Sequence, residues 1–351
     1  MKKKRSVLLI YTGGTIGMIE NAKTGALENF DFDRLLRYVP ELKRFNYQIS
    51  AYQFNPPIDS SDMDVEHWKK LVEIIHGNYS QFDGFVVLHG TDTMAYTASA
   101  LSFMLENLTK PVIITGSQLP IGMLRTDGKE NLITAIEIAA AANPDGSPIV
   151  SEVCILFENS LLRGNRTTKI SAENFNAFRS YNFPNLAHVG IHIRYEKHLL
   201  RKPDFDKPMI PHYRMNPNVV IFTLFPGIQE HIISGILDNK ALKAVVFKTF
   251  GSGNAPQKEW LIQLLKRAVD KGVIVVNITQ CLIGSVEMEK YTTGRQLLST
   301  GVIGGYDITP ESALTKLMFL LGQGYTSDQI RERMNRDIAG EISVADNSRY
   351  L

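Results

Sequence analysis

Short apolar runs alternate with segments of helical periodicity along the first half of the chain. Four runs of four or five residues are apolar almost throughout, which favours strands that are buried on both faces of a sheet. These predicted strands are Val7–Tyr11, Phe85–Leu88, Val112–Thr115 and Val153–Phe157.

Helical segments separate these strands. Trp68, Leu71, Val72 and Ile75 recur at helical spacing and Gly77 follows them, which predicts one helix ahead of the second strand. Further helices are predicted at 94–105 and 131–142. This alternation of strand and helix predicts an α/β domain with a mostly parallel sheet that is covered on both faces.

The alternation of apolar strands and helical segments stops at Arg194. Four prolines interrupt a polar and basic stretch up to Pro217, and prolines remove backbone donors and disfavour helix. We therefore expect an N-terminal domain over residues 1–193, a proline-rich connector over 194–217, and a smaller C-terminal α/β domain over 218–351.

The alternation resumes after the connector. The second domain is expected to contain three strands, two helices between them and two closing helices. These are strands at 219–224, 244–249 and 273–278, and helices at 229–237, 259–270, 312–321 and 327–336.

The composition is that of a globular protein with two domains. A length of 351 residues favours two domains, and 44% hydrophobic with 21% charged residues is typical of a globular protein. The net charge of +2 predicts neither a nucleic-acid-binding surface nor a membrane-binding one. The basic start, residues 1–5, precedes an apolar run of only five residues, too short for a secretory signal, so we interpret Val7–Tyr11 as the first strand.

Cysteine usage points to a reducing compartment and no metal. Cys154 and Cys281 both fall in apolar, strand-like runs, and we expect them to be reduced core residues of an intracellular protein. No CxxC or HExxH motif occurs, and none of the eight histidines has a partner at metal-binding spacing, so all are interpreted as non-catalytic.

Polar clusters follow the strands of the first domain, where α/β proteins bind ligands. The first, Thr12–Gly17, is a glycine turn that can present N–H groups to an oxyanion, although alone it is more typical of an ordinary strand-to-loop turn. The second, Asp59–Met63, is expected to include the N-cap of the Trp68 helix, which leaves Asp59 and Ser60 to face a ligand.

Two further clusters contain reactive side chains. His89–Met94 combines threonines with Asp92 at the start of a helix, the parts that activation of a hydroxyl requires, although helix capping explains it equally well. In Arg163–Lys169, the lysine can act as a base only when burial or neighbouring cations lower its pKa. Thr115–Gln118, with Ser117, either lines the same pocket or turns the chain.

Taken in this order, the motifs closely resemble those of the bacterial-type L-asparaginases, and specifically the type I (cytoplasmic) group. The resemblance covers essentially the whole chain. It rests on residues 11–18, 59–63, 89–93, 163–169, 251–256 and 277–281.

The resemblance implies the asparaginase/glutaminase architecture, with a flavodoxin-like C-terminal domain, and assigns roles at matching positions. Thr15 would be the nucleophile, and Thr91, Asp92 and Lys169 a base and proton-relay group. Asp59 and Ser60, together with Asp92, would bind the α-amino and α-carboxylate groups of the substrate. In relatives, the residue that matches Asn254 reaches the active site of a neighbouring subunit.

The chemistry that follows is hydrolysis of L-asparagine to L-aspartate and ammonia through an acyl-enzyme, with no cofactor. Many members of the family, especially secreted ones, carry a tyrosine in the loop after the first motif that helps to activate the first threonine. Here that loop is Ala22–Leu27, with Ala26 at about the tyrosine's position. Either a residue outside this loop activates Thr15, or Thr91 has a larger role in the reaction than the one assigned to it.

The type I group also implies a cytoplasmic homodimer or homotetramer that can respond to asparagine at a second, regulatory site. Thr168, Lys248 and Cys281 lie in segments that resemble this site.

Three alternatives remain at this point. A glutaminase-asparaginase differs by one methylene in its substrate, which a pocket discriminates by only about 1–3 kcal/mol. The amidase subunit of a tRNA-dependent amidotransferase usually carries an N-terminal domain ahead of the first motif, which here begins at Thr12. A non-catalytic amino-acid sensor predicts loss of a reactive residue, and all four of Thr15, Thr91, Asp92 and Lys169 are present.

Overall fold

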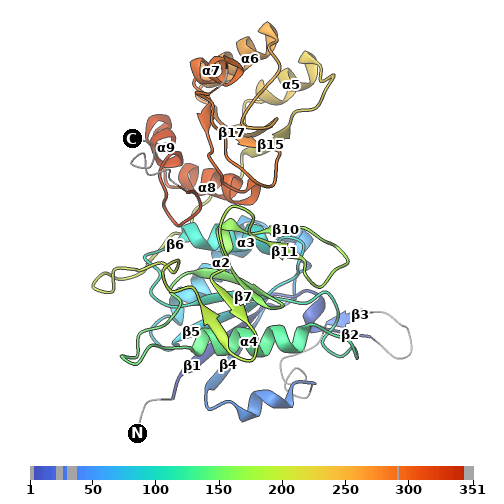
Figure 1. The fold of residues 1–351 in the computed structure, drawn as a ribbon, viewed down its shortest axis with the longest axis vertical. Coiled ribbons are helices and arrows are strands. Elements are labelled where there is room, and N and C mark those ends of the chain that lie inside the picture. The colour runs from blue at the N-terminus through green and yellow to red at the C-terminus, as the bar shows by residue number, and fades with distance from the viewer. Residues whose placement is uncertain (1–3, 21–26, 30–37, 291, 344–351) are drawn as a thin grey trace. The chain divides into compact units, whose positions relative to one another are not determined.

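A computed structural model describes residues 4–20, 27–29, 38–290 and 292–343 of the chain (Figure 1). The chain divides into two compact units. The first comprises residues 1–180 and 184–213, and the second comprises 181–183 and 214–351.

The first unit is built on an eight-stranded mixed sheet in the order β13-β12-β9-β8-β7-β5-β1-β4. Five neighbouring strands are parallel, and three antiparallel strands extend one side. The parallel strands are β1 (Ser6–Tyr11), β4 (Gln48–Gln53), β5 (Gly84–Leu88), β7 (Val112–Thr115) and β8 (Val153–Phe157). The antiparallel ones are β9 (Ser160–Arg163), β12 (Ala187–Val189) and β13 (Ile193–Tyr195).

Helices cover both faces of this sheet, as the alternation of strands and helices predicts. In Figure 1, α2 (Val65–Gly77) and α3 (Met94–Met104) lie on one face and α4 (Gly128–Ala140) lies on the other. Every residue of β5, β7 and β8 is buried, which is the environment that continuous apolar strands require. The mostly parallel α/β domain is therefore confirmed.

Short elements connect the main ones. They are the two-stranded sheets β2 (Met18–Glu20) with β3 (Leu27–Asn29), β10 (Thr168–Lys169) with β11 (Phe178–Arg179), and β14 (Ile210–Pro211) with β6 (Leu105–Glu106), and the 3-10 turns η1 (Thr15–Gly17), η2 (Pro40–Arg44), η3 (Ser60–Asp62) and η4 (Gly164–Arg166).

The second unit contains a four-stranded parallel sheet in the sequential order β15-β16-β17-β18. A buried cluster of side chains from its strands and from α5 and α6 forms its core. Its strands are β15 (Val219–Thr223), β16 (Ala244–Thr249), β17 (Ile274–Thr279) and β18 (Ile303–Gly304). Its helices are α5 (Glu230–Leu237), α6 (Glu259–Asp270), α7 (Thr292–Ser299), α8 (Pro310–Gly322) and α9 (Ser327–Met334).

Most of the segment expected to be a connector belongs to the first unit, because the division falls at residues 213 and 214. The Asn107 side-chain amide donates hydrogen bonds to the carbonyls of Asp204 and Lys207, at 2.9 and 2.8 Å. In addition, β14 pairs with β6. The prolines of this segment have no backbone N–H to donate. The side-chain amide of Asn107 instead supplies hydrogen-bond donors to the segment's backbone carbonyls.

Among the described residues, no helix is long and apolar enough to cross a membrane.

Candidate active site

Three polar motifs meet at one edge of the first unit's sheet. Since β1, β5 and β7 are parallel neighbours, the residues that follow them lie side by side. Thr12 continues the pairing beyond β1, because its backbone N–H and its hydroxyl both donate to the carbonyl of Leu88 at 3.0 Å. The backbone N–H of His89 likewise donates to the carbonyl of Thr115 at 2.9 Å.

Glycines allow these motifs to approach more closely than other residues would. A Cβ added to Gly14 would lie 2.5 Å from the Cα of Gly90, and one added to Gly90 would lie 2.5 Å from the hydroxyl oxygen of Ser60. A Cβ on Gly13 would lie 2.0 Å from the carbonyl oxygen of Ile58. Side chains at these glycines would separate the motifs, so the glycines bring together the segments around Thr15, Ser60 and Thr91.

Thr15 begins the turn η1 and is half-buried beside the fully buried Ile16. No hydrogen bond joins its hydroxyl to any residue in the described part of the chain. The following loop, including Ala22 and Ala26 of the interpretation above, lies outside the described residues.

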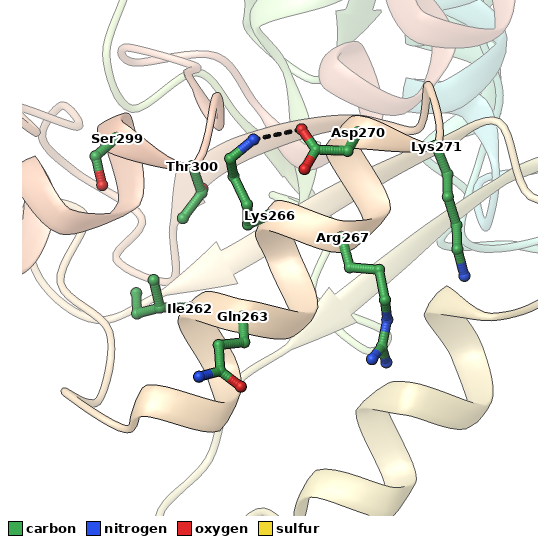
Figure 2. A pocket seen from close by; sticks show the side chains of 8 residues that line it. All are labelled: Ile262, Gln263, Lys266, Arg267, Asp270, Lys271, Ser299 and Thr300. Carbon is green, nitrogen blue, oxygen red and sulfur yellow. Dashed lines mark hydrogen bonds and ion pairs between the residues drawn. The ribbon is translucent and has the colours of Figure 1, made fainter.

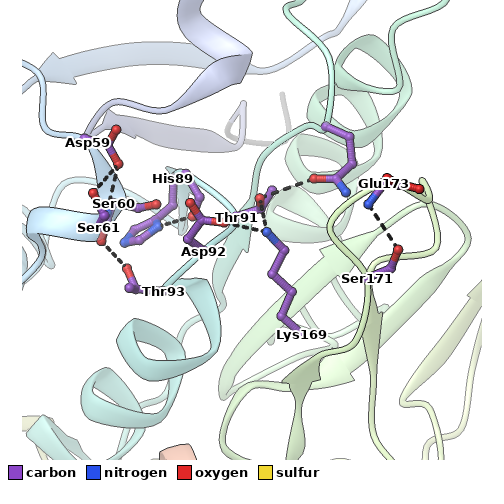
Figure 3. A network of polar contacts seen from close by, with 12 residues as sticks. Asp59, Ser60, Ser61, His89, Thr91, Asp92, Thr93, Lys169, Ser171 and Glu173 are labelled. Atoms are coloured by element: carbon purple, nitrogen blue, oxygen red, sulfur yellow. Dashed lines mark hydrogen bonds and ion pairs between the residues drawn. The ribbon is translucent and has the colours of Figure 1, made fainter.

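Lys169 connects Thr91 and Asp92 (Figure 3). Its Nζ lies 2.8 Å from Thr91 Oγ1 and 2.6 Å from Asp92 Oδ1. The side chain of Lys169 is 19% exposed and that of Asp92 is 66% exposed, so this ion pair opens to solvent on the carboxylate side. The three residues predicted as the base and relay group are therefore in direct contact.

Sequence reasoning did not assign a role to Gln118, which completes this network. The Thr91 hydroxyl donates to Gln118 Oε1 at 3.3 Å, and Gln118 Nε2 donates to the carbonyl of Asn174 at 3.1 Å. Asp127 holds the turn, since both its carboxylate oxygens accept from the Gln118 backbone N–H at 3.1 and 3.0 Å. The motif Thr115–Gln118 after β7 was the signal that could have identified this residue.

Asp59 is exposed and its carboxylate is fixed by Ser61. Asp59 Oδ1 accepts from both the backbone N–H and the hydroxyl of Ser61 at 2.9 Å, and these hydrogen bonds lower the pKa of Asp59. The N-cap of α2 is Asp64, one residue beyond the predicted cluster, with its carboxylate accepting from Glu66 and His67. The prediction that Asp59–Met63 contains this cap was therefore wrong.

Ser60 is buried, and its carbonyl accepts from the Thr93 hydroxyl at 2.6 Å, which ties η3 to the start of α3. Ser117 is also buried, and its hydroxyl donates to the carbonyl of Leu119 at 2.5 Å. Of the two predicted alternatives for Ser117, turning the chain accounts for its hydroxyl.

Of the remaining predicted site residues, Thr168 directly precedes Lys169, and Asn254, Lys248 and Cys281 belong to the second unit. Asn254 follows β16, and its side-chain oxygen accepts from the Thr293 hydroxyl at 2.6 Å. Thr168 in β10 and Lys248 in β16 are half-buried. Cys281 is exposed, which corrects its interpretation as a core residue: β17 ends at Thr279, and the chain has left the sheet by residue 281.

His89 is fully buried directly before the second threonine motif. Burial lowers its pKa to about 4, so the ring is neutral at physiological pH. Its Nδ1 lies 2.6 Å from the carbonyl oxygen of Gly90, and its Nε2 lies 2.9 Å from Thr97 Oγ1.

A separate basic hollow of about 580 Å³ lies on the second unit beside α6 (Figure 2). Each of its cations has an ion-pair partner: Lys266 pairs with Asp270, and Arg267 and Lys271 share Asp238. The three cations face only two carboxylates, so the hollow keeps a small excess of positive charge, and these exposed pairs do not by themselves make a binding site.

Comparisons with known proteins agree across both units. Residues 6–201 match the family described as asparaginase, N-terminal, and residues 218–334 match the glutaminase/asparaginase C-terminal domain. L-asparaginase 1 of Escherichia coli (strain K12) is 44% identical, with 98% of this chain and 100% of that protein covered. The crystal structure of L-asparaginase I from Vibrio cholerae superimposes with a TM-score of 0.88 at 40% identity, covering 97% and 100% of the two chains.

A mouse protein named 60 kDa lysophospholipase is 40% identical, and the match covers 98% of this chain but 64% of that protein. The similarity to this longer protein thus extends over one part of it.

Proposed function

This chain belongs to the asparaginase family, and from this membership we propose that it hydrolyses L-asparagine to L-aspartate and ammonia with Thr15 as nucleophile. The observation that carries the proposal is the contact of Lys169 with both Thr91 and Asp92, beside the glycine turn that bears Thr15. The full-length similarity to L-asparaginase 1 favours this activity over a glutaminase-asparaginase, an amidotransferase subunit or a sensor.

In the first step, the hydroxyl oxygen of Thr15 attacks the side-chain amide carbon of asparagine. The hydroxyl proton passes to the base group and from there to the departing nitrogen, which leaves as ammonia. The product is a β-aspartyl ester on Thr15. In the second step, water attacks the ester and releases aspartate, and the oxygen of Thr15 regains its proton.

The base group is Thr91 with Lys169. An ammonium cannot accept a proton, so Lys169 acts as a base only as the neutral amine, and Thr91 would pass its own proton to that amine as it accepts the proton of Thr15. The hydrogen bond from Thr91 to Gln118 and the one from Lys169 to Thr91 hold the hydroxyl oxygen in place. Asp92 positions Lys169 from the other side at 2.6 Å.

The backbone N–H of Thr91 is a candidate donor to the tetrahedral oxyanion. Within the described residues it has no hydrogen-bond partner, and it lies where the two threonine motifs touch. A preorganised donor of this kind typically contributes about 2.7–4 kcal/mol to transition-state stabilisation.

Substrate binding is assigned to charged and polar groups around this centre. The ionised carboxylates of Asp59 and Asp92 would bind the α-ammonium, and Ser60 the α-carboxylate. Ser117 would contribute only if its hydroxyl released the carbonyl of Leu119. Asn254 would reach the active site of a neighbouring subunit in a homodimer or homotetramer.

Neither chemical step transfers an electron or hydride, and the groups named above supply the nucleophile, base and donors, so the proposal includes no cofactor or metal. We place the enzyme in the cytoplasm, since Cys154 and the exposed Cys281 are both free thiols.

Regulation by asparagine is part of the same proposal. Thr168, Lys248 and Cys281 would contribute to a second site for asparagine at an interface between subunits. The proposal predicts a sigmoidal dependence of rate on asparagine concentration that becomes hyperbolic in Thr168→Ala. A hyperbolic curve for the unaltered oligomer would contradict this regulatory role and leave the hydrolase assignment intact.

The experiment that tests the activity is ammonia release by the purified protein from L-asparagine and L-glutamine. Fast release from asparagine and slow release from glutamine are expected. Comparable rates would favour the glutaminase-asparaginase. No ammonia from either amide, with the protein folded and asparagine bound, would support the sensor or an amidase subunit that depends on a partner.

A further inference from the structure

A chain of hydrogen bonds runs from α2 through α3 to the peptide that precedes Thr91. The indole Nε1 of Trp68 donates to Thr97 Oγ1 at 2.9 Å, and Thr97 Oγ1 lies 2.9 Å from His89 Nε2. On the other side of the ring, His89 Nδ1 lies 2.6 Å from the carbonyl oxygen of Gly90. Trp68, Thr97 and His89 are all buried.

The chemistry of these groups fixes every proton in the chain. An indole nitrogen only donates and a carbonyl oxygen only accepts, so Thr97 accepts from Trp68 and His89 Nδ1 must carry a hydrogen for Gly90. A neutral imidazole carries one hydrogen, so Nε2 is an acceptor and the Thr97 hydroxyl donates to it. The direction of donation is therefore Trp68 to Thr97 to His89 to Gly90.

Burial strongly disfavours the doubly protonated, charged form of the His89 ring. The pKa of His89 is about 4 because the ring is fully desolvated, and a doubly protonated ring would also point its Nε2 hydrogen at Thr97. The Thr97 hydroxyl would then have to turn its own hydrogen away while accepting from two donors. At neutral pH the single tautomer with hydrogen on Nδ1 satisfies all four groups.

The backbone at Gly90 needs a hydrogen bond to hold its conformation. A Cβ there would lie 2.5 Å from Ser60 Oγ, so the approach of η3 permits only glycine. Glycine is the residue with the greatest backbone freedom, and the peptide that follows it carries the N–H of Thr91. A hydrogen bond to the Gly90 carbonyl restricts rotation of this peptide.

We propose that His89 is a positioning residue for the reaction, which Thr97 and Trp68 hold in the tautomer that fixes the peptide between Gly90 and Thr91. His89 touches no reacting atom. It acts through this peptide, which orients both the hydroxyl of Thr91 toward Lys169 and the backbone N–H of Thr91 toward the oxyanion. The inference rests on the role proposed above for Thr91.

The tautomer can be measured without activity. In protein with ¹⁵N-labelled histidine rings, the two nitrogens of a neutral ring differ in chemical shift according to which one carries hydrogen. The His89 signals, identified by their loss in His89→Asn, are expected to show hydrogen on Nδ1 at neutral pH. Hydrogen on Nε2 would overturn the proposal whatever the variants do.

Two amide substitutions separate the two sides of the ring. In His89→Asn, the short side chain places its NH₂ near the position of Nδ1 and can still donate to Gly90. In His89→Gln, the longer side chain places its amide near Nε2 and leaves the Gly90 carbonyl without its donor. We expect kcat to fall about 100-fold in His89→Gln, the cost of a small misplacement of reacting groups, with little change in KM, and far less in His89→Asn.

Two substitutions of Thr97 test the Nε2 side of the His89 ring in the same way. Thr97→Ser keeps the hydroxyl and should keep kcat, whereas Thr97→Val, of the same shape, leaves His89 Nε2 and Trp68 Nε1 without partners and should lower it. Equal losses in His89→Asn and His89→Gln, both folded by circular dichroism, would overturn the proposal. Absence of ammonia release by the unaltered protein would instead contradict the proposed function, and the ¹⁵N measurement would still decide the tautomer.

Discussion

The Cα of Gly90 lies 2.5 Å from the position that a Cβ on Gly14 would occupy. The backbones of the two glycine turns are therefore in contact, and each turn continues directly into one of the proposed reactive threonines, Thr15 and Thr91. The contact would allow the proposed nucleophile on one loop and its proposed base on the other to act on the same substrate.

Substitution of Gly14 tests this contact. Gly14→Ala would force the two turns apart, and we expect a loss of activity of at least about 100-fold from displaced reacting groups. Gly146→Ala is the matched control, since Gly146 has φ of +89° against +90° for Gly14 but nothing within 4 Å of an added Cβ. Both variants carry backbone strain, about 1–3 kcal/mol at Gly14, whose ψ of 171° lies in a region that essentially only glycine adopts, and thermal unfolding will report it. Equal activity of the two would show that the contact is unimportant.

Replacement of Lys169 separates its two roles. Lys169→Arg keeps a cation that can donate to Thr91 and Asp92 but cannot deprotonate, whereas Lys169→Met removes both the charge and the base. We expect kcat to fall about 10²–10⁴-fold in both variants, the usual range for loss of a general base. Near-normal turnover by Lys169→Arg would mean that Lys169 acts only through its charge.

The pH dependence of activity tests Asp59. The backbone N–H and hydroxyl of Ser61 lower the pKa of Asp59, so the ionised carboxylate is favoured in the folded protein, and the stability it contributes is lost as pH falls through that lowered pKa. Ser61→Ala removes one donor, so the pKa of Asp59 should rise and the acid limb of kcat/KM should move to higher pH.

The control for this shift lies in a distant loop with the same local arrangement. Asp145 accepts from the backbone N–H and hydroxyl of Ser147 at 2.9 and 2.6 Å, and its pKa is likewise lowered. Ser147→Ala should leave the kcat/KM profile unchanged. If Ser61→Ala also leaves it unchanged, Asp59 does not bind the substrate ammonium.

A buried ion pair should stabilise the second unit's C-terminal segment. Lys316 Nζ lies 2.5 Å from Glu341 Oε1, both side chains are 0% exposed, and Lys316 also donates to the carbonyl of Arg336 at 2.6 Å. Lys316→Met would remove the cation from the buried Glu341 carboxylate, which would keep only hydrogen bonds such as those from the Ile338 and Ala339 backbone N–H groups, and we expect the free energy of unfolding to fall by about 3–5 kcal/mol.

The exposed pair of Lys207 with Asp204, at 2.9 Å, provides the comparison. Lys207→Met should leave unfolding by denaturant unchanged within error. If Lys316→Met were as stable as Lys207→Met, the pair would not hold the C-terminal segment in place.

Central strands were predictable because burial on both faces leaves a continuous apolar run. The predictions for Val112–Thr115 and Val153–Phe157 match β7 and β8 to the residue. The edge strand β4 was missed, because none of its residues is fully buried and Gln48, Ser50 and Gln53 prevent a continuous apolar run. β9 was missed because it ends in Arg163, whose burial depends on the ion pair with Glu152 at 2.6 Å, a partner that local sequence does not reveal.

The meeting of the polar motifs was also predictable, because parallel neighbouring strands end at the same edge of a sheet. The contacts themselves were not. That Lys169 reaches Thr91 and that Gln118 accepts from it depend on the conformation of two loops, and neither loop has a periodic pattern. The exposure of Cys281 was missed because the apolar run around it continues past the end of β17.

We propose that Thr15 carries the acyl group while Thr91 serves as part of its base. Peptide mapping by mass spectrometry after acid quench of the enzyme during turnover of L-asparagine, with Thr15→Ala and Thr91→Val alongside, tests it most directly. We expect an aspartyl ester on the peptide that contains Thr15, and near-complete loss of ammonia release in both variants. An ester on the peptide that contains Thr91, or retained activity in Thr15→Ala, would contradict it.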